Sequence, residues 1–312
     1  MIKNAIIFKA ELPVGYALEI HMEERPWREI TASEERVNAF WSDEGKKLVQ
    51  KFPGGYAFCM RTDEKVLPSS VVKVEADKEI NKIKRDGEKV TGQDKAAIRL
   101  SSKERLLKRA LVKQRYTWAY YLEDDNLLIV DSASKGVADT LVSLLIFVCG
   151  SVKTQTIHIS DIKKGFTTRL RDENHEDHPF GRLGLGEYIQ LSRKEEGVPT
   201  EKITFAHTDL AECDILGPLF SGYEVDVIEF IYGTTEFRMT SDFHFKRFSF
   251  PKMEIAEDED ALHRFQVEAA EETSQIREIA LELCRLMEYT PPTIEEMEAA
   301  SGGTDSSTTG EP

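Results

Sequence analysis

Residues 116–150 read YTWAYYLEDDNLLIVDSASKGVADTLVSLLIFVCG, and they contain the clearest structural pattern in the chain. Two runs rich in apolar and aromatic residues, 116–122 and 126–131, flank a polar turn, which is typical of a β-hairpin. The hydroxyl groups at 132–134 favour a helix start, and 135–148 is composed like a helix that Gly150 would end. We therefore expect a strand–turn–strand–helix unit here.

The residues before this unit predict further strands and two charged helices. Apolar runs at 5–12 and 56–60 predict strands, whereas Ser-Glu-Glu-Arg-Val at 33–37 has the pattern of a helix start. Helices are expected at 69–89 and 102–115, because apolar residues recur there at helical spacing between charged ones.

The residues after the unit predict mainly strands and one long helix. Runs at 223–230, 234–239 and 243–250 predict an antiparallel meander, and 259–288 predicts a long amphipathic helix. Residues 165–200 are rich in glycine and polar side chains and predict loops with at most one short strand. Strands and helices do not alternate regularly, which favours an α+β fold with antiparallel sheets. The expected regions are 1–72, 73–115 (a basic helical arm), 116–152, 153–251 (loop-rich and antiparallel β), 252–300 (acidic and helical) and 301–312 (a disordered tail).

Charge is distributed unevenly along the 312 residues, whose formal net charge is −15. Residues 73–115 hold 14 basic and 7 acidic side chains, whereas 252–300 hold 14 acidic and 4 basic ones. The total charge alone would argue against a nucleic-acid partner, because like charges repel. The asymmetry between regions is the better guide to partners, and it leaves such a partner open.

Apolar runs and cysteines indicate the cellular setting. The longest nearly pure apolar run, 141–149, is far shorter than the roughly 20 residues of a membrane-spanning helix, and charges interrupt the N-terminal residues too early for a signal peptide. Cys59, Cys149, Cys213 and Cys284 show no CxxC spacing and lie among apolar residues. We expect reduced, buried thiols and a cytoplasmic protein without a membrane partner.

The basic residues of 73–115 are candidates for contacts with a phosphate backbone, which needs cations and no base-edge contacts. No aromatic residue is interleaved with them, and this argues against stacking on single strands and favours duplex DNA. The alternative is a solvated charged helix face, because acidic residues are interspersed. The first set of candidates is Arg99, Lys103, Arg105, Lys108, Arg109 and Lys113, and the second set is Lys73, Lys82, Lys84 and Arg85.

Other motifs carry weaker signals. The run DENHEDH at 172–178 has metal-ligating residue types, but without the helix-face spacing of zinc sites it is better interpreted as a hydrated acidic loop. The glycines at 181–186 reverse the order of a dinucleotide fingerprint, and Ser132 and Ser134 fit helix capping better than a nucleophile elbow. There is no Walker A motif and no acid–Lys nuclease core, so we assign no catalytic residue, metal ion or cofactor.

A family resemblance is carried by residues 63–73, DEKVLPSSVVK. They are similar to the Glu-Lys-Ile-Leu-Pro-x-x-Val-Ile-Lys motif of the RdgC family of recombination-associated proteins. Lys-Arg-Ala-Leu at 108–111, LLIVDSAS at 127–134 and ADTL at 138–141 continue the match in the same order. The resemblance is good over 62–150 and thin elsewhere.

The resemblance implies a bacterial nucleoid-associated protein that forms a ring-shaped homodimer with a protruding basic helical arm. Such a ring encloses double-stranded DNA without marked sequence preference and restrains RecA-dependent recombination. Arg109 falls where the family has an arginine lining the hole, and Leu111 falls where it has a phenylalanine at a subunit contact. Ala-His-Thr at 206–208 stands where the family has Lys-Lys-Gln, and the family's Gly-Trp-Val-Pro-Pro segment is missing.

Two other function classes remain open. One is a metal-dependent exonuclease involved in recombination, which is how the family is sometimes labelled. The other is an interaction protein whose acidic helix, through Glu271, Glu272 and Glu278, docks on a basic partner or mimics DNA.

Overall fold

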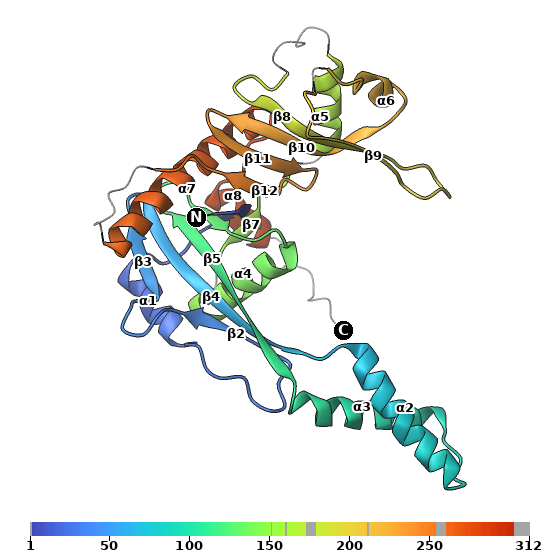
Figure 1. Cartoon of the computed structure of the whole chain (residues 1–312). Coiled ribbons are helices and arrows are strands. Elements are labelled where there is room, and N and C mark those ends of the chain that lie inside the picture. Colours follow the sequence, from blue (N-terminus) through green and yellow to red (C-terminus); the bar gives the residue numbers. More distant parts are fainter. Residues whose placement is uncertain are drawn as a thin grey trace, which may run out of the picture. The chain divides into compact units, whose positions relative to one another are not determined.

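The computed structural model of the chain is α+β, as predicted (Figure 1). It describes residues 2–150, 152–159, 161–172, 179–210, 212–253 and 260–302. They form two compact units. The first comprises the described residues of 1–21, 49–58 and 118–312, and the second comprises 22–48 and 59–117. Within the part of the chain that the structure describes, no helix is both long and apolar enough to span a bilayer.

The first unit is built on an antiparallel sheet with the strand order β5-β6-β1-β12-β11-β10-β8-β9. In that order the strands are Leu111–Leu122, Leu127–Val130, Asn4–Ala10, Phe245–Ser249, Thr235–Thr240, Glu224–Tyr232, Gly184–Arg193 and Glu201–Ala206. Two short pairings complete the sheet: β3 (Val49–Phe52) pairs with β4 (Gly55–Val66), and β7 (Thr154–Thr156) pairs with β1. The helices of this unit are α1 (Tyr16–Glu23, which runs into the second unit), α4 (Lys135–Cys149), α5 (Ile162–Arg171), α6 (Leu216–Phe220), α7 (Ala261–Leu286) and α8 (Ile294–Gly302).

The hairpin and helix predicted from 116–150 are confirmed. Strands β5 and β6 pair with Ala119 opposite Val130, and α4 ends at Gly150, whose positive φ of 79° suits glycine. The expected capping differs in detail. Ser134 is the N-cap residue but makes no side-chain cap hydrogen bond, and the Oγ of Ser132 instead accepts the amide N–H of Ser134 at 3.1 Å.

A cluster of aromatic side chains fills the core of the first unit. The predicted meander is confirmed as β10, β11 and β12, and it buries Phe230, Phe237 and Phe245. The ring of Phe180 lies 4.9 Å from that of Phe230, and Phe166 on α5 lies 5.8 Å from it. The predicted long helix is α7, which packs a buried apolar side on this core.

The prediction of loops over 165–200 is wrong, because α5 and the ten-residue strand β8 occupy much of it. Non-local packing decides this region: α5 packs on β10, and β8 pairs with both β10 and β9. Gly184 and Gly186 lie within β8, and no phosphate-binding turn forms there. Most of the predicted acidic loop and tail, 173–178 and 303–312, lies outside the described residues.

The four cysteines are free thiols, as expected, but only two of them are buried. Burial raises the pKa of Cys59 to about 12 and that of Cys284 to about 11. Cys149 and Cys213 are half-buried. Both buried thiols therefore stay protonated at neutral pH, which makes them poor nucleophiles.

The second unit contains β2 (Arg36–Trp41), α2 (Ser69–Arg85) and α3 (Gly92–Leu107). It also contains β4 from Cys59 onward and β5 up to Thr117. The predicted helix start at 33–37 is wrong, because Arg36 begins a strand that pairs antiparallel with β4. Val37, Ala39 and Phe40 are buried by this pairing. The tertiary partner overrides the local helix-start pattern.

The second charged helix also differs from the prediction of 102–115. It is α3, which begins at Gly92 and ends at Leu107, so Lys113 and Arg115 lie on β5. Thr91 and Asp94 form a capping box that starts the helix early, and 111–117 is recruited into the sheet. The first charged helix is confirmed as α2 and ends four residues earlier than expected.

Gly55 shows how closely the backbones approach within the first unit. A Cβ atom at this position would lie 2.2 Å from the carbonyl oxygen of Tyr121 and 3.0 Å from Cζ of Phe52. Both neighbours are buried in the sheet, so neither can move away without disturbing the packing.

We predict that Gly55→Ala lowers the free energy of unfolding by about 2–3 kcal/mol, the usual cost of overpacking a core. Gly92→Ala is the matched control, because a Cβ there meets nothing within 4 Å, and it should be neutral or stabilising by up to about 1 kcal/mol. Urea unfolding of both variants measures the difference. Equal stabilities would contradict the packing described.

Candidate nucleic-acid interface

The predicted basic segment folds mainly as a helical hairpin, α2–α3 (Figure 1). Pro68 precedes α2 with extended backbone, and the capping box starts α3: Asp94 accepts the amide N–H of Thr91 at 2.8 Å, and Thr91 accepts that of Asp94 at 3.2 Å. The Thr91 hydroxyl donates to the same carboxylate at 2.7 Å, and together with the Thr91 amide it holds the pKa of the Asp94 carboxyl below its ordinary value. The capping box thus fixes the start of α3 locally, whereas α2 begins after Pro68 without a side-chain cap.

The two helices bury only a narrow strip between them. Ala76 and Ile80 on α2 are buried, as are Ser102 and Leu107 on α3. The hydroxyl of Ser102 makes no hydrogen bond within the described residues, although it is fully buried. Because this strip contains so few residues, most of the charged side chains of both helices are exposed to solvent.

All ten predicted phosphate-contacting residues lie in the second unit, on this hairpin or just after it. Nine of them are exposed, and Lys103 is half-buried. The second predicted set lies on α2, and three of its members are in the last turn, where cations also favour the helix dipole. The first set is divided: Arg99, Lys103 and Arg105 lie on α3, Lys108 and Arg109 follow its end, and Lys113 lies on β5.

The single helical surface expected from Arg105 to Lys113 is therefore not present, because the backbone changes from helix to strand between them. Basic side chains are nevertheless concentrated there: residues 92–115 hold eight basic and two acidic side chains. Residues 73–91 hold six basic and five acidic ones. The positive field is thus stronger along α3 and the start of β5 than along α2.

Acidic side chains engage two of the ten candidates. The Lys103 ammonium lies 2.6 Å from Oε1 of Glu35, and Arg105 lies 3.2 Å from Glu75 and 3.7 Å from Glu79. The other eight candidates make no ion pair with any described residue. Sequence reasoning missed these acidic partners, because Glu35 is remote in the chain and only the packing of α2 on α3 brings Glu75 to Arg105.

Apolar side chains are exposed beside these cations. Leu111 is 81% exposed, and Leu100 on α3 is 59% exposed. Val112 and Tyr116 on β5 are also exposed. A contiguous patch of such side chains marks a contact with another protein surface, whereas single exposed ones are common.

The other candidate sites are only partly covered by the described residues, because 173–178 of the run with metal-ligating residue types lie outside them. No group of three or more His, Cys, Asp or Glu side chains in the described part of the chain could hold a metal ion. Ala206, which ends β9, and His207 stand where the resemblance places two lysines, and neither carries an ammonium group. On the acidic helix α7, Glu272 is buried and accepts the amide N–H of Ile2 at 2.6 Å, so it is not available to a partner.

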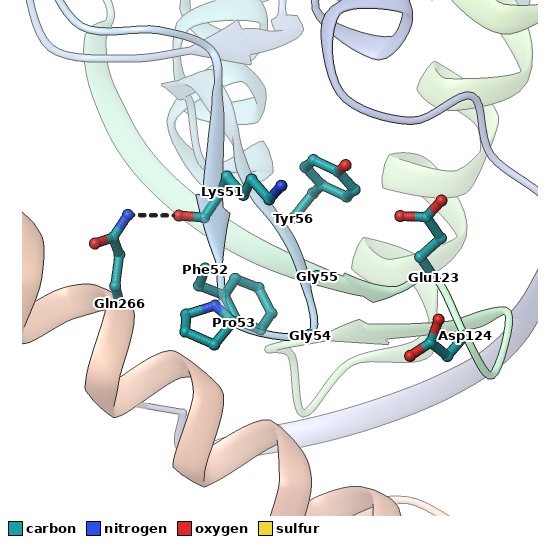
Figure 2. Close-up of a pocket in the computed structure, with 9 residues that line it drawn as sticks. All are labelled: Lys51, Phe52, Pro53, Gly54, Gly55, Tyr56, Glu123, Asp124 and Gln266. Atoms are coloured by element: carbon teal, nitrogen blue, oxygen red, sulfur yellow. Dashed lines mark hydrogen bonds between the residues drawn. The ribbon is translucent and has the colours of Figure 1, made fainter.

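One surface pocket of the first unit is shown in Figure 2. Lys51 and Gln266 line one side, joined by a 2.8 Å hydrogen bond from the Gln266 amide to the Lys51 carbonyl, and Glu123 and Asp124 line the other. None of the predicted phosphate-contacting residues lines it. Two carboxylates beside one ammonium make it a poor site for a phosphate group.

Fold and site together define an α+β protein with a helical hairpin rich in unpaired cations. A family model described as "Putative exonuclease, RdgC" matches residues 1–290. The chain therefore belongs to the RdgC family, as its motifs predicted.

Curated relatives carry the name recombination-associated protein RdgC. The protein of Shewanella frigidimarina (strain NCIMB 400) is 26% identical over 208 residues, which cover 66% of this chain and 67% of that protein. The protein of Shewanella loihica (strain ATCC BAA-1088 / PV-4) is 25% identical over 256 residues, covering 80% and 83%. That of Colwellia psychrerythraea (strain 34H / ATCC BAA-681) is 27% identical over 163 residues, covering 50% and 53%. The family is thus one associated with recombination.

The buried, unpartnered hydroxyl of Ser102 gives a test of the hairpin's packing. We predict that Ser102→Ala raises the free energy of unfolding by about 1 kcal/mol, because it removes the desolvation cost of that hydroxyl. Ser101→Ala, at an exposed neighbour on the same helix, should have little effect. Chemical denaturation compares the two variants, and a loss of stability in Ser102→Ala would show that the hydroxyl is satisfied.

Proposed function

We propose that this protein binds double-stranded DNA without marked sequence preference, through the basic side chains of the α2–α3 hairpin and the start of β5. The carrying observation is the concentration of cations there: residues 92–115 hold eight basic and two acidic side chains, in a chain whose net charge is −15. Of these eight, only Lys103 and Arg105 form an ion pair with a described residue. Each cation neutralises a phosphate and releases condensed counterions, which is the main source of affinity in non-specific binding.

The proposed contacts are the eight exposed candidates that pair with no acidic side chain in the described part of the chain. Those at and after the end of α3 have the strongest field, since only Glu104 and Asp94 oppose it in 92–115. The residues are Arg99, Lys108, Arg109, Lys113, Lys73, Lys82, Lys84 and Arg85. The lack of aromatic side chains among them supports a duplex backbone as the ligand, because single-strand binding relies on base stacking.

We further propose that two chains form a homodimer that closes around the duplex, with Leu111 at a subunit contact. The high exposure of Leu111 supports this assignment. Two copies of the basic segment would then face one channel, while the acidic remainder would keep DNA off the outer surface. A closed ring that occupies DNA on the bacterial nucleoid would restrain RecA-dependent strand exchange. In this proposal the protein acts in the cytoplasm and needs no cofactor.

Salt dependence tests the proposed interface. For Lys108→Ala/Arg109→Ala, the slope of log K against log salt should fall by about 1.8, since each lost phosphate contact removes about 0.9. The matched control is Lys46→Ala/Lys47→Ala, which removes the same charge from a loop of the second unit outside the hairpin. Fluorescence anisotropy with a labelled duplex at several salt concentrations measures both. An unchanged slope in the hairpin variant would exclude these residues as DNA contacts.

A metal-dependent exonuclease is the second candidate function, because the family model carries that description. Our proposal is that the chain is not an enzyme, and it predicts no release of mononucleotides from end-labelled duplex DNA incubated with Mg²⁺ or Mn²⁺. A variant with the carboxylates of 172–177 changed to amides is the control for a metal site there. Processive degradation that survives further purification and disappears in that variant would establish the exonuclease instead.

A further inference from the structure

The segment Trp27–Glu35 connects α1 to β2 and contacts β4, the strand that leads into α2. Figure 1 shows the course of the three elements. Arg61, Asp63 and Lys65 alternate along β4, so their side chains share one face of the strand. Each of them contacts the segment or the aromatic side chains beside it. All of these residues belong to the second unit.

The first contact of the segment is with a buried ion pair of β4. The indole N–H of Trp27 donates to Oδ2 of Asp63 at 3.1 Å, and the Arg61 guanidinium lies 4.0 Å from the centre of the indole ring. Arg61 also donates to both carboxylate oxygens of Asp63, at 2.8 and 3.1 Å. The side chains of this ion pair are only 10% and 4% exposed. A pair this buried and fully hydrogen-bonded fixes Trp27 on β4.

The second contact uses a lysine of the motif that carries the family resemblance. The Lys65 ammonium donates to the carbonyl oxygens of Thr31 and Ala32, both at 2.7 Å, and its backbone N–H donates to the carbonyl of Glu35 at 2.9 Å. Charge-assisted hydrogen bonds to two consecutive carbonyls hold the backbone of a loop in one conformation.

The third contact reaches the hairpin. Glu35, placed beside β4 by the backbone of Lys65, extends its carboxylate to within 2.6 Å of the Lys103 ammonium on α3. The segment is also ordered internally, because Glu34 accepts from the Arg28 guanidinium and from the N–H of Thr31. Those hydrogen bonds hold the pKa of Glu34 well below its ordinary range.

We propose that Trp27–Glu35 is a brace that positions the α2–α3 hairpin, and that Lys65 is the positioning residue that holds the brace on β4. Lys103 then belongs to the brace and not to the DNA contacts. The brace is a property of the protein without DNA. Only the expected effect on DNA binding rests on the proposed function.

The test uses Lys65→Met, which keeps the aliphatic stem and removes the donors, and Lys65→Arg, which keeps donors for the carbonyls. Lys46→Met is the charge-matched control in the same unit. Without DNA, hydrogen exchange of 27–35 and of α3 around Lys103 should be on the order of tenfold faster in Lys65→Met, close to the parent rate in Lys65→Arg and unchanged in the control. Unchanged exchange in α3 of Lys65→Met would overturn the brace.

The DNA readout separates positioning from phosphate contact. Lys65→Met should bind duplex DNA on the order of fivefold to tenfold more weakly with the salt slope of the parent, whereas a slope lower by about 0.9 would make Lys65 a phosphate ligand and overturn the proposal. If the parent chain binds no duplex and the exchange results hold, the brace stands and the proposed function fails.

Discussion

The pairing of β1 on both of its edges is the constraint on which the sheet of the first unit depends. Ile6–Lys9 pair with β6 on one side, and Asn4 and Ala5 pair with β12 on the other. Residues from the start, the middle and the last third of the chain therefore meet at one strand. A pairing of this sequence separation cannot form until most of the chain has been made, so the sheet is complete only when β12 joins it.

Two carboxyl groups hold the beginning of this strand. Asp131, which follows β6, accepts the amide N–H groups of Lys3 at 3.2 Å and Asn4 at 2.9 Å, and Glu272 on α7 accepts that of Ile2. Burial raises the pKa of both carboxyls, while the amide donors oppose that shift. The donors would otherwise be left without partners in the sheet, which is the more costly arrangement. Because Glu272 satisfies a backbone donor of the sheet, the acidic helix α7 contributes to the core as well as to the surface.

Local patterns predicted the elements whose partners are close in sequence. The β5–β6 hairpin, α4, the β10–β12 meander and α7 follow from turn residues, apolar periodicity and helix ends. The sequence does not predict β2 and β8, because pairing with β4 in one case, and with β9 and β10 in the other, outweighs a helix-like start in β2 and a glycine-rich composition in β8. The boundary between α3 and β5 was missed for the same reason: Lys and Leu favour helix, but 111–117 is recruited into the sheet.

The candidate site shows a similar division between local and non-local information. The positions of basic residues can be read from the sequence. Whether an acidic side chain already pairs with each of them cannot, because Glu35 reaches Lys103 only in the folded unit. The contacts of the brace cannot be predicted from residue types, since Lys65 binds backbone carbonyls, which every residue has. A motif match identified Lys65 without explaining it, and the folded unit supplies the physical reason.

The distribution of charge decides how a chain with a net charge of −15 could bind a polyanion. At physiological ionic strength the Debye length is about 8 Å, so a phosphate at the hairpin senses the nearby cations far more than distant acidic side chains. Near 0.01 M salt that length grows to about 30 Å, so acidic side chains farther from the phosphate also act on it. The number of unpaired cations per chain also sets a ceiling on phosphate contacts. Ion pairs such as those of Lys103 and Arg105 lower that ceiling below what the sequence alone suggests.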